Sequence, residues 1–228
     1  MSVNSFLIDL DYRVFLAVNS DLTSQWLDPV MALACQMGTV RIVYPLSALL
    51  LFLFDRTRIV RGMISISAVL FLGIFVGGIL KDMVSRERPN DKIIASVLGK
   101  EANVRLLYVS KEFPFVGSRE STASWQNEIG LGMPRGNSFP SGHAIVAFGV
   151  AAVLARHFMR FRNAFFICAV IASISRIYLG VHFLTDVVFG GIIGLIIARL
   201  VLAAFDQGWP LAAVNSPSRI LLGEGVER

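Results

Sequence analysis

The chain has 228 residues, a formal net charge of +5, and 55% hydrophobic against only 16% charged residues. Soluble domains carry about a quarter charged residues, so this composition argues against a soluble globular protein. The positive charges are scattered between apolar runs and form no basic face, which argues against a nucleic-acid partner. We predict a single domain that is embedded in a membrane.

The first 35 residues are consistent with two different structures. Apolar residues recur at helical spacing over 7–18 and again over 26–34, but the polar run 19–25 between them could not lie in hydrocarbon. We therefore favour two short helices in residues 1–35 that lie in the membrane interface. One additional spanning helix is the alternative.

Five later segments are apolar enough to cross a bilayer as helices, which takes about 20 residues. They are residues 36–54, 62–80, 139–155, 164–181 and 187–205. These segments are apolar around their whole circumference, so they cannot be surface helices of a soluble protein. The sequence therefore predicts an all-α fold, a polytopic membrane helix bundle of five to six transmembrane helices. Two glycine pairs, Gly73 with Gly77 and Gly190 with Gly194, predict close helix packing.

Two short arginine-rich loops, 55–61 and 156–163, set the predicted orientation, because basic loops stay on the cytoplasmic side. Residues 36–206 then form the membrane domain, which carries the candidate site. Within that domain, 90–138 is a long extracytoplasmic loop. Residues 207–228 form a cytoplasmic tail.

Five further side chains are interpreted as structural. His157 lies in a basic loop and is expected to be solvated, while Arg41 and Arg199 lie near helix ends and are expected to reach water. Cys35 and Cys168 lie in apolar surroundings without metal-type spacing, which predicts buried thiols.

The first segment that carries chemistry follows the 62–80 helix and contains Lys81, Arg86 and Arg88. Basic clusters that only anchor a helix belong on the cytoplasmic side, whereas the predicted topology places this one outside. A site for an anion is the better interpretation, since arginine offers a planar fork to phosphate oxygens and lysine a point charge. Arg86 could equally be a simple surface charge.

The second segment is Pro140-Ser141-Gly142-His143, at the start of an apolar run. Proline favours the first turn of a helix, where unpaired backbone N–H groups and the helix dipole bind anions. Gly142 lets an oxyanion approach closely, and Ser141 adds a hydroxyl donor. His143 falls within the first turn, beside the same anion.

The third segment contains Arg176, His182 and Asp186. Arg176 lies about 18 Å into a hydrocarbon core of about 30 Å, where an arginine is costly and indicates function. Gly180 is expected to end that helix. His182 and Asp186 are four residues apart, so they share a face if a new helix holds both. The carboxylate would then fix one imidazole nitrogen and leave the other as a nucleophile.

Together these segments resemble the signature motifs of the type 2 phosphatidic acid phosphatase superfamily. This superfamily includes bacterial lipid phosphate phosphatases, glucose-6-phosphatases and vanadium haloperoxidases. All signature positions are present in order, and the resemblance covers roughly residues 60–205. The matching residues are Lys81, Arg88 and Pro89, then Pro140, Ser141, Gly142 and His143, then Ser175, Arg176, His182 and Asp186.

The resemblance implies a role for each of these polar residues. His182 would attack phosphorus and become phosphohistidine, Asp186 would orient it, and His143 would protonate the leaving oxygen and then activate water. The phosphate oxygens would be bound by the remaining polar positions, which are Lys81, Arg88, Ser141, Gly142 and Arg176. The phosphatases of this superfamily work without Mg²⁺, so the resemblance implies no metal and no cofactor. The sequence also has no clustered carboxylates that would hold Mg²⁺.

We therefore expect an enzyme, a metal-independent phosphatase that hydrolyses a lipid phosphate monoester or diphosphate at the extracytoplasmic face. Candidate substrates are phosphatidylglycerol phosphate, phosphatidic acid, undecaprenyl diphosphate and lipid A phosphates. The expected location is the bacterial cytoplasmic (inner) membrane, with the site facing the periplasm or exterior. One alternative is a lipid phosphotransferase that uses the same histidine. The other is a non-catalytic lipid-phosphate binder or transporter, which the presence of His182 and Asp186 disfavours.

Overall fold

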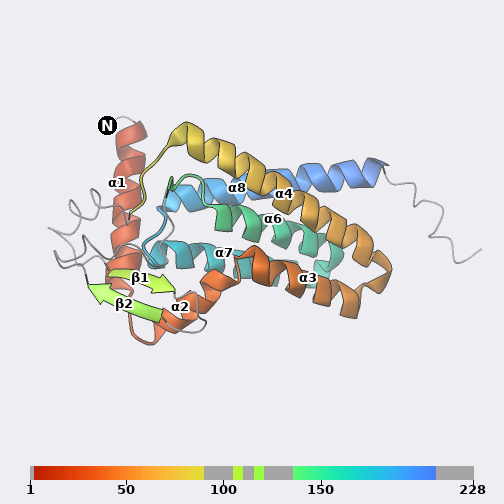
Figure 1. The fold of residues 1–228 in the computed structure, drawn as a ribbon, viewed down its shortest axis with the longest axis horizontal. Coiled ribbons are helices and arrows are strands. Elements are labelled where there is room, and N and C mark those ends of the chain that lie inside the picture. The colour runs from red at the N-terminus through yellow and green to blue at the C-terminus, as the bar shows by residue number, and fades with distance from the viewer. Residues whose placement is uncertain (1–2, 90–104, 110–115, 121–135, 209–228) are drawn as a thin grey trace, which may run out of the picture.

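The fold is taken from a computed structural model that describes residues 3–89, 105–109, 116–120 and 136–208. Most of the predicted extracytoplasmic loop and nearly all of the predicted cytoplasmic tail lie outside the described residues. The described chain is a bundle of α-helices with one small two-stranded antiparallel sheet (Figure 1).

The helices account for nearly all of the regular structure. In chain order they are α1 (Val3–Leu16), α2 (Leu27–Gln36), α3 (Val40–Phe54), α4 (Ile59–Val84), α6 (Gly142–His157), α7 (Arg162–Tyr178) and α8 (Leu184–Gly208). A π-helical turn, Ala17–Asp21, follows α1, and short 3₁₀ turns, Arg56–Arg58 and Met159–Phe161, precede α4 and α7. The strands β1 (Arg105–Val109) and β2 (Val116–Glu120) pair in the register Arg105 with Glu120.

Three described helices are long and apolar enough to cross a membrane, namely Arg56–Val84, Met159–Tyr178 and Leu184–Phe205. Helices α2 and α3 would make a fourth span if they are counted together, although they meet at a bend of 71°. Helix α6 is apolar but has only 16 residues, about 24 Å of rise against a core of about 30 Å. The predicted five to six spans therefore include segments that do not qualify by length alone.

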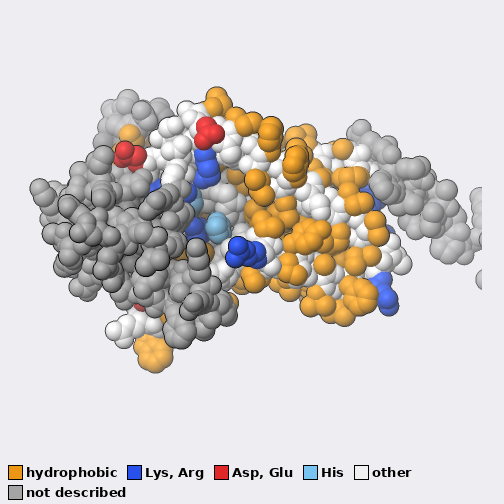
Figure 2. Space-filling view, viewed as in Figure 1, with side chains coloured by type: hydrophobic (Ala, Val, Ile, Leu, Met, Phe, Trp, Pro, Cys, Tyr) orange, Lys and Arg blue, Asp and Glu red, His pale blue; other side chains and the backbone are white. Residues whose placement is uncertain are grey.

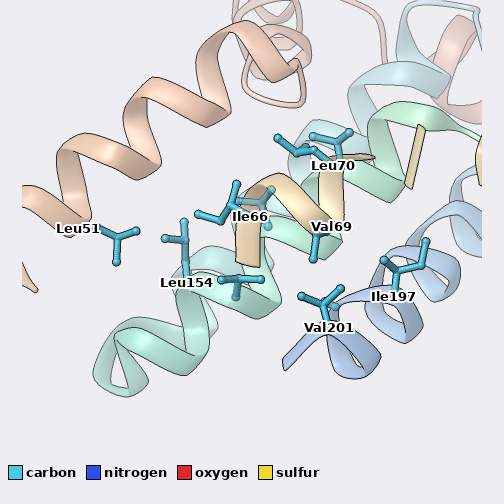
Figure 3. Packing of buried hydrophobic residues seen from close by; sticks show 11 residues of the cluster. Leu51, Ile66, Val69, Leu70, Leu154, Ile197 and Val201 are labelled. Carbon is cyan, nitrogen blue, oxygen red and sulfur yellow. The ribbon is translucent and has the colours of Figure 1, made fainter. Parts of the chain in front are cut away.

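Helix α6 lies at the centre of the bundle, between α4, α7 and α8. Its residues are buried along almost its whole length, which explains why its sequence shows no polar face. The main hydrophobic core forms where α3, α4, α6 and α8 meet, around Leu51, Ile66, Leu154 and Val201 (Figure 3). This core keeps α6 fixed below the candidate site.

The two predicted glycine pairs are confirmed as close-packing positions. A Cβ at Gly73 would come within 2.8 Å of Ile145 on α6, and one at Gly77 within 3.0 Å of the same side chain. On the other side of α6, a Cβ at Gly190 would lie 2.6 Å from the Ser141 carbonyl oxygen, and one at Gly194 would overlap the Ile145 carbonyl. Because glycine has no side chain, α4 and α8 approach the first turns of α6 closely.

The N-terminal region contains two helices separated by a non-helical segment. Helix α1 runs crosswise to the other helices at one end of the bundle (Figure 1). It packs there through Phe15, which is fully buried, while Phe6 and Ile8 are exposed. On the loop between α1 and α2, Trp26 is 89% exposed. Apolar side chains exposed on short helices are typical of the membrane interface, and the placement of residues 1–35 there stays a prediction.

Two side chains, His157 and Cys168, differ from the expectations drawn from the sequence. His157 is not solvated, because its side chain is only 7% exposed and its Nδ1 lies 3.0 Å from an Asp55 carboxylate oxygen. This contact joins the loop after α3 to the end of α6, at the end of the bundle away from α1. Cys168 is exposed on α7, whereas Cys35 is buried as predicted.

Candidate active site

The three sequence segments converge at the end of the bundle where α1 lies. Lys81 and Arg88 come from the end of α4 and the chain after it, His143 from the first turn of α6, and Arg176 and His182 from the end of α7 and the following turn. Figure 2 shows Lys/Arg and His atoms together in a hollow on this side of the molecule. All eight predicted site residues belong to this convergence.

Backbone hydrogen bonds hold the segments together. The Ser141 N–H donates to the Asp186 carbonyl over 3.0 Å, which joins the start of α6 to the start of α8. The Ser138 N–H donates to the Arg86 carbonyl over 2.7 Å, and the Ser138 hydroxyl donates to the Glu87 carbonyl over 3.1 Å. The relative positions of the segments are therefore set by the main chain.

His182 and Asp186 form the predicted pair, but one helix does not hold both of them. Helix α7 ends at Tyr178, Gly180 has the left-handed φ of 75°, and α8 begins only at Leu184. His182 thus lies in the turn before α8, where its N–H donates to the Arg176 carbonyl. Its Nδ1 lies 3.6 Å from Asp186 Oδ2, a separation that is long for a hydrogen bond.

Asp186 is fully buried and held on both carboxylate oxygens. Oδ2 accepts a hydrogen bond of 2.8 Å from the Phe183 N–H and faces His182, while Oδ1 accepts one of 2.9 Å from Arg86 Nη1. A carboxylate with both oxygens engaged cannot rotate freely. It therefore presents Oδ2 to the His182 ring from a fixed position, although Nδ1 of that ring makes no hydrogen bond among the described residues.

The ring of His182 presents its other nitrogen to the cationic side of the site. Nε2 lies 3.5 Å from Arg88 Nη1, so the nitrogen that Asp186 does not face points toward a guanidinium. Burial lowers the pKa of His182 to about 3; Asp186 raises this pKa, and the charges of Arg176 and Arg88 lower it. The imidazole is therefore neutral near pH 7, with a lone pair available on Nε2.

Three cations from different elements lie in the site. Arg88 and Arg176 are 6% and 7% exposed, and Lys81 is half-buried. Arg88 Nε donates to the Gly136 carbonyl, and Lys81 Nζ donates over 3.0 Å to the Asn137 carbonyl. Arg176 is buried inside the bundle and does not reach the outer surface.

The start of α6 supplies the remaining predicted residues. Ser141 is the N-cap residue of α6. His143 lies in the first turn of that helix, close enough to Arg176, Arg88 and Lys81 to interact with their positive charges. A Cβ added at Gly142 would meet no heavy atom within 4 Å, so there is open space beside this helix start. The buried Ser141 Oγ has no hydrogen-bond partner among the described residues, nor does the buried Nε of Arg176. Unpaired donors of this kind suit the oxygens of a phosphate group.

Two residues next to the site were missed by the sequence reasoning, and a third was left open. Arg86 is not a surface charge, because it bonds both Asp186 and Asp11. Asp11 occupies the same helical stripe as Leu7 and Val18, and a carboxylate on an apolar stripe was the available signal. Cys35 accepts a contact of 2.6 Å from Arg176 Nη1, and nothing in its local sequence indicates this.

Two solved structures share this fold. LpxE of Aquifex aeolicus aligns with 89% of this chain and 99% of its own at a TM-score of 0.61 and 24% identity. The transmembrane PAP2 type phosphatidylglycerolphosphate phosphatase of Bacillus subtilis aligns with 89% of this chain and 87% of its own, at a TM-score of 0.56 and 24% identity. This fold and the long apolar helices together show that the chain is an integral membrane protein.

Curated relatives match over shorter stretches. A lipid A 1-phosphatase of Rhizobium etli is 36% identical over 85 residues, which are 33% of this chain and 37% of that protein. Phosphatidylglycerophosphatase B of Bacillus subtilis is 41% identical over 81 residues, 31% of this chain and 39% of that protein. The matched stretches thus span well under half of each relative. The PAP2 superfamily model, however, matches residues 62–210, more than half of the chain, and the protein therefore belongs to the PAP2 superfamily.

Proposed function

We propose that this protein is a membrane phosphatase that hydrolyses a lipid phosphate monoester or diphosphate through a phosphohistidine at His182. The observation that carries this proposal is the orientation of one ring. Nδ1 of His182 faces the buried carboxylate of Asp186 at 3.6 Å, and Nε2 faces Arg88 at 3.5 Å. A neutral nucleophile aimed into a group of cations is the arrangement that phosphoryl transfer requires.

In the first step, Nε2 of His182 attacks phosphorus while the bond between phosphorus and the leaving oxygen breaks. His143 donates a proton to that oxygen, so the lipid leaves as a neutral alcohol or a shorter phosphate. The imidazole of His182 gains positive charge during the attack, and the carboxylate of Asp186 stabilises that charge. The product of this step is a phosphohistidine on His182.

In the second step, His143 accepts a proton from a water molecule as that water attacks the phosphohistidine. The bond between nitrogen and phosphorus breaks, and inorganic phosphate leaves. His182 returns to the neutral state in which it began. The position of His143 in the first turn of α6, near His182, supports this alternating role as acid and base.

Charge stabilisation in both steps is assigned to Lys81, Arg88 and Arg176, together with Ser141 and the N–H groups at Gly142. Burial strengthens the attraction between these cations and the oxygens of phosphate, because water does not screen it. We propose that these groups replace a metal ion. We therefore expect activity to persist after exhaustive treatment with EDTA.

The proposed substrate is a lipid phosphate whose chains stay in the bilayer while its head group enters the site from the membrane surface. The curated relatives include a lipid A 1-phosphatase and a phosphatidylglycerophosphatase, which supports a phosphorylated lipid as the class. We propose that the site faces the periplasm of a bacterial inner membrane. The arginine-rich loops at the opposite end of the bundle support this orientation.

The decisive experiment measures inorganic phosphate released by the purified protein in detergent. The panel contains phosphatidylglycerol phosphate, phosphatidic acid, undecaprenyl diphosphate and lipid A, each without added acceptor lipid. Release from at least one of them, together with an acid-labile phosphoenzyme that His182→Gln lacks, is expected. Turnover that needs an acceptor lipid would instead identify a phosphotransferase, and no turnover with any member would overturn the proposal.

A further inference from the structure

Asp11 is a buried carboxylate that lies outside the family match at 62–210. It belongs to α1, and its side chain is only 3% exposed. Buried carboxylates are rare unless they are paired, so a residue of this kind requires an explanation.

The polar contacts of Asp11 among the described residues lead toward the His182–Asp186 pair. Its Oδ2 lies 2.7 Å from Arg86 Nη2, and Arg86 Nη1 donates over 2.9 Å to Asp186 Oδ1. The same carboxylate accepts from Thr185 twice, with Oδ1 2.8 Å from the backbone nitrogen and Oδ2 2.6 Å from the hydroxyl. Thr185 directly precedes Asp186, so α1 holds the start of α8 from outside that helix.

Aromatic contacts fix α1 against the same turn. Tyr12 and Phe15 of α1 pack on Phe183, with ring centroids 5.6 Å and 5.7 Å apart. The guanidinium carbon of Arg86 lies 4.3 Å from the centre of the Phe183 ring. Arg86 is therefore confined between a ring and two carboxylates. Its Nη1 is shared between Asp186 and the Thr185 hydroxyl, which it meets at 2.6 Å, and its Nη2 is directed at Asp11.

The competition between the two carboxylates for Arg86 has a chemical consequence. A guanidinium binds a lone carboxylate through two parallel hydrogen bonds, which occupy both oxygens. If Arg86 bound Asp186 in this way, Oδ2 would no longer be available to orient His182. With Asp11 present, Arg86 divides its two terminal nitrogens between the carboxylates, and Asp186 keeps Oδ2 directed at His182 Nδ1.

We propose that Asp11 is a positioning residue for the reaction at His182: through Arg86 and Thr185 it keeps Asp186 in the geometry that orients the nucleophile. This inference rests on the proposed phosphatase function. It assigns to the N-terminal helix, which the family match does not include, a part in assembling the active site.

The test compares Asp11→Asn with Asp9→Asn in the full-length protein. Asp9 lies on the same helix and forms an ion pair of 2.8 Å with Arg13, but on the surface, so its loss should have little effect. Asp11→Asn should lower kcat about tenfold or more, because a buried hydrogen bond to a charged group is lost. KM should change by less than about twofold, since Lys81, Arg88 and Arg176 are not held by Asp11. Equal kcat values in the two variants would overturn the proposal.

A second variant shows whether Asp11 acts through Arg86. In an Arg86→Gln background, Asp11→Asn should change kcat by less than about twofold, because the arginine that it positions is absent. Fully additive losses in kcat would contradict the coupling between Asp11 and Arg86.

If Asp11→Asn does not give a monodisperse protein, Arg86→Lys serves in its place. It keeps the positive charge but cannot bind both carboxylates, so the same loss in kcat is expected, and wild-type kcat would contradict the proposal.

A readout without turnover separates this inference from the proposed function. The chain has three histidines, so ¹⁵N-histidine labelling gives few ring signals, and His182→Gln identifies those of His182. Asp11→Asn should shift the ring-nitrogen signals of His182, whereas Asp9→Asn should leave them unchanged. If the wild type released no phosphate but these shifts occurred, the phosphatase proposal would fail while the positioning role stood. Unchanged signals in Asp11→Asn would overturn the positioning role itself.

Discussion

The bundle carries a histidine–aspartate pair at each end, and the surroundings of the two pairs differ. At the α1 end, His182 faces Asp186 at 3.6 Å, and at the other end His157 faces Asp55 at 3.0 Å. The second pair is the shorter one, so distance alone does not mark a catalytic pair. The difference lies in what meets the other ring nitrogen.

Nε2 of His182 faces Arg88 at 3.5 Å, whereas Nε2 of His157 packs against Gly62, where an added Cβ would come within 3.2 Å. The arginines near His182 are buried, while Arg56 and Arg160 at the opposite end are exposed to solvent. Buried cations attract an anion far more strongly than solvated ones. The same pair of residues thus lies beside buried cations at one end, where we propose that it orients a nucleophile, and joins two loops at the other.

The largest effect is expected from replacing each histidine by alanine. His182→Ala should lower phosphate release by about 10⁴-fold or more, because it removes the nucleophile. His157→Ala should retain activity within a few fold while lowering stability by about 1–3 kcal/mol, since Asp55 loses its buried partner. Phosphate release and thermal unfolding in detergent measure the two effects. A comparable loss of activity in His157→Ala would remove the distinction between the two ends.

His143 provides the next largest effect, and it depends on the substrate. His143→Ala should slow hydrolysis of alkyl phosphates by about 10²- to 10⁴-fold, because their leaving oxygen needs a proton. An activated aryl phosphate, whose leaving group departs unprotonated, should lose much less. The measurement is kcat/KM for both substrate types in wild type and variant. Equal losses across leaving groups would contradict the acid role of His143.

The local features of both ends could be predicted from the sequence. The apolar runs indicated α3, α4, α6, α7 and α8, because a helix surrounded by lipid or other helices must be apolar on every side. The residues of the cationic site were also identifiable, since charges beside apolar segments stand out. The glycine pairs predicted the close approach at α6 because a missing side chain is itself a local signal.

The remaining features depend on packing between distant segments. The contact of Cys35 with Arg176 joins residues 141 positions apart, and that of Asp11 with Thr185 joins residues 174 apart. His157 appeared solvated because its neighbours in sequence are basic, yet Asp55 and Gly62 from other elements enclose it. Periodicity describes which face of a helix is buried but not what that face meets.

The stability of the folded protein at acid pH tests the environment of His182 without measuring turnover. The pKa of His182 is about 3 in the folded protein against an ordinary value of 6.5, chiefly because of burial. Between these values the unfolded chain binds a proton that the folded protein does not. Stability is therefore undiminished above pH 6.5 and is lost as the pH falls toward 3, by up to about 1.4 kcal/mol per pH unit. Unfolding temperatures at pH 7.5, 6, 5 and 4 should fall less steeply in His182→Gln, and parallel curves would contradict this environment for His182.

The smallest effect is expected from removing the contact of Cys35 with the buried Arg176. Buried cations of this kind distinguish the site from the opposite end of the bundle. Cys35 and Cys168 form a matched pair, since both lie on apolar helices and only Cys35 contacts Arg176. Cys35→Ala removes the acceptor of Arg176 Nη1 and should lower kcat/KM by about three- to tenfold, whereas Cys35→Ser should keep most of the activity. Cys168→Ala should resemble the wild type because its side chain is exposed. If Cys35→Ala also resembled the wild type, the orientation of Arg176 would not depend on its contact with α2.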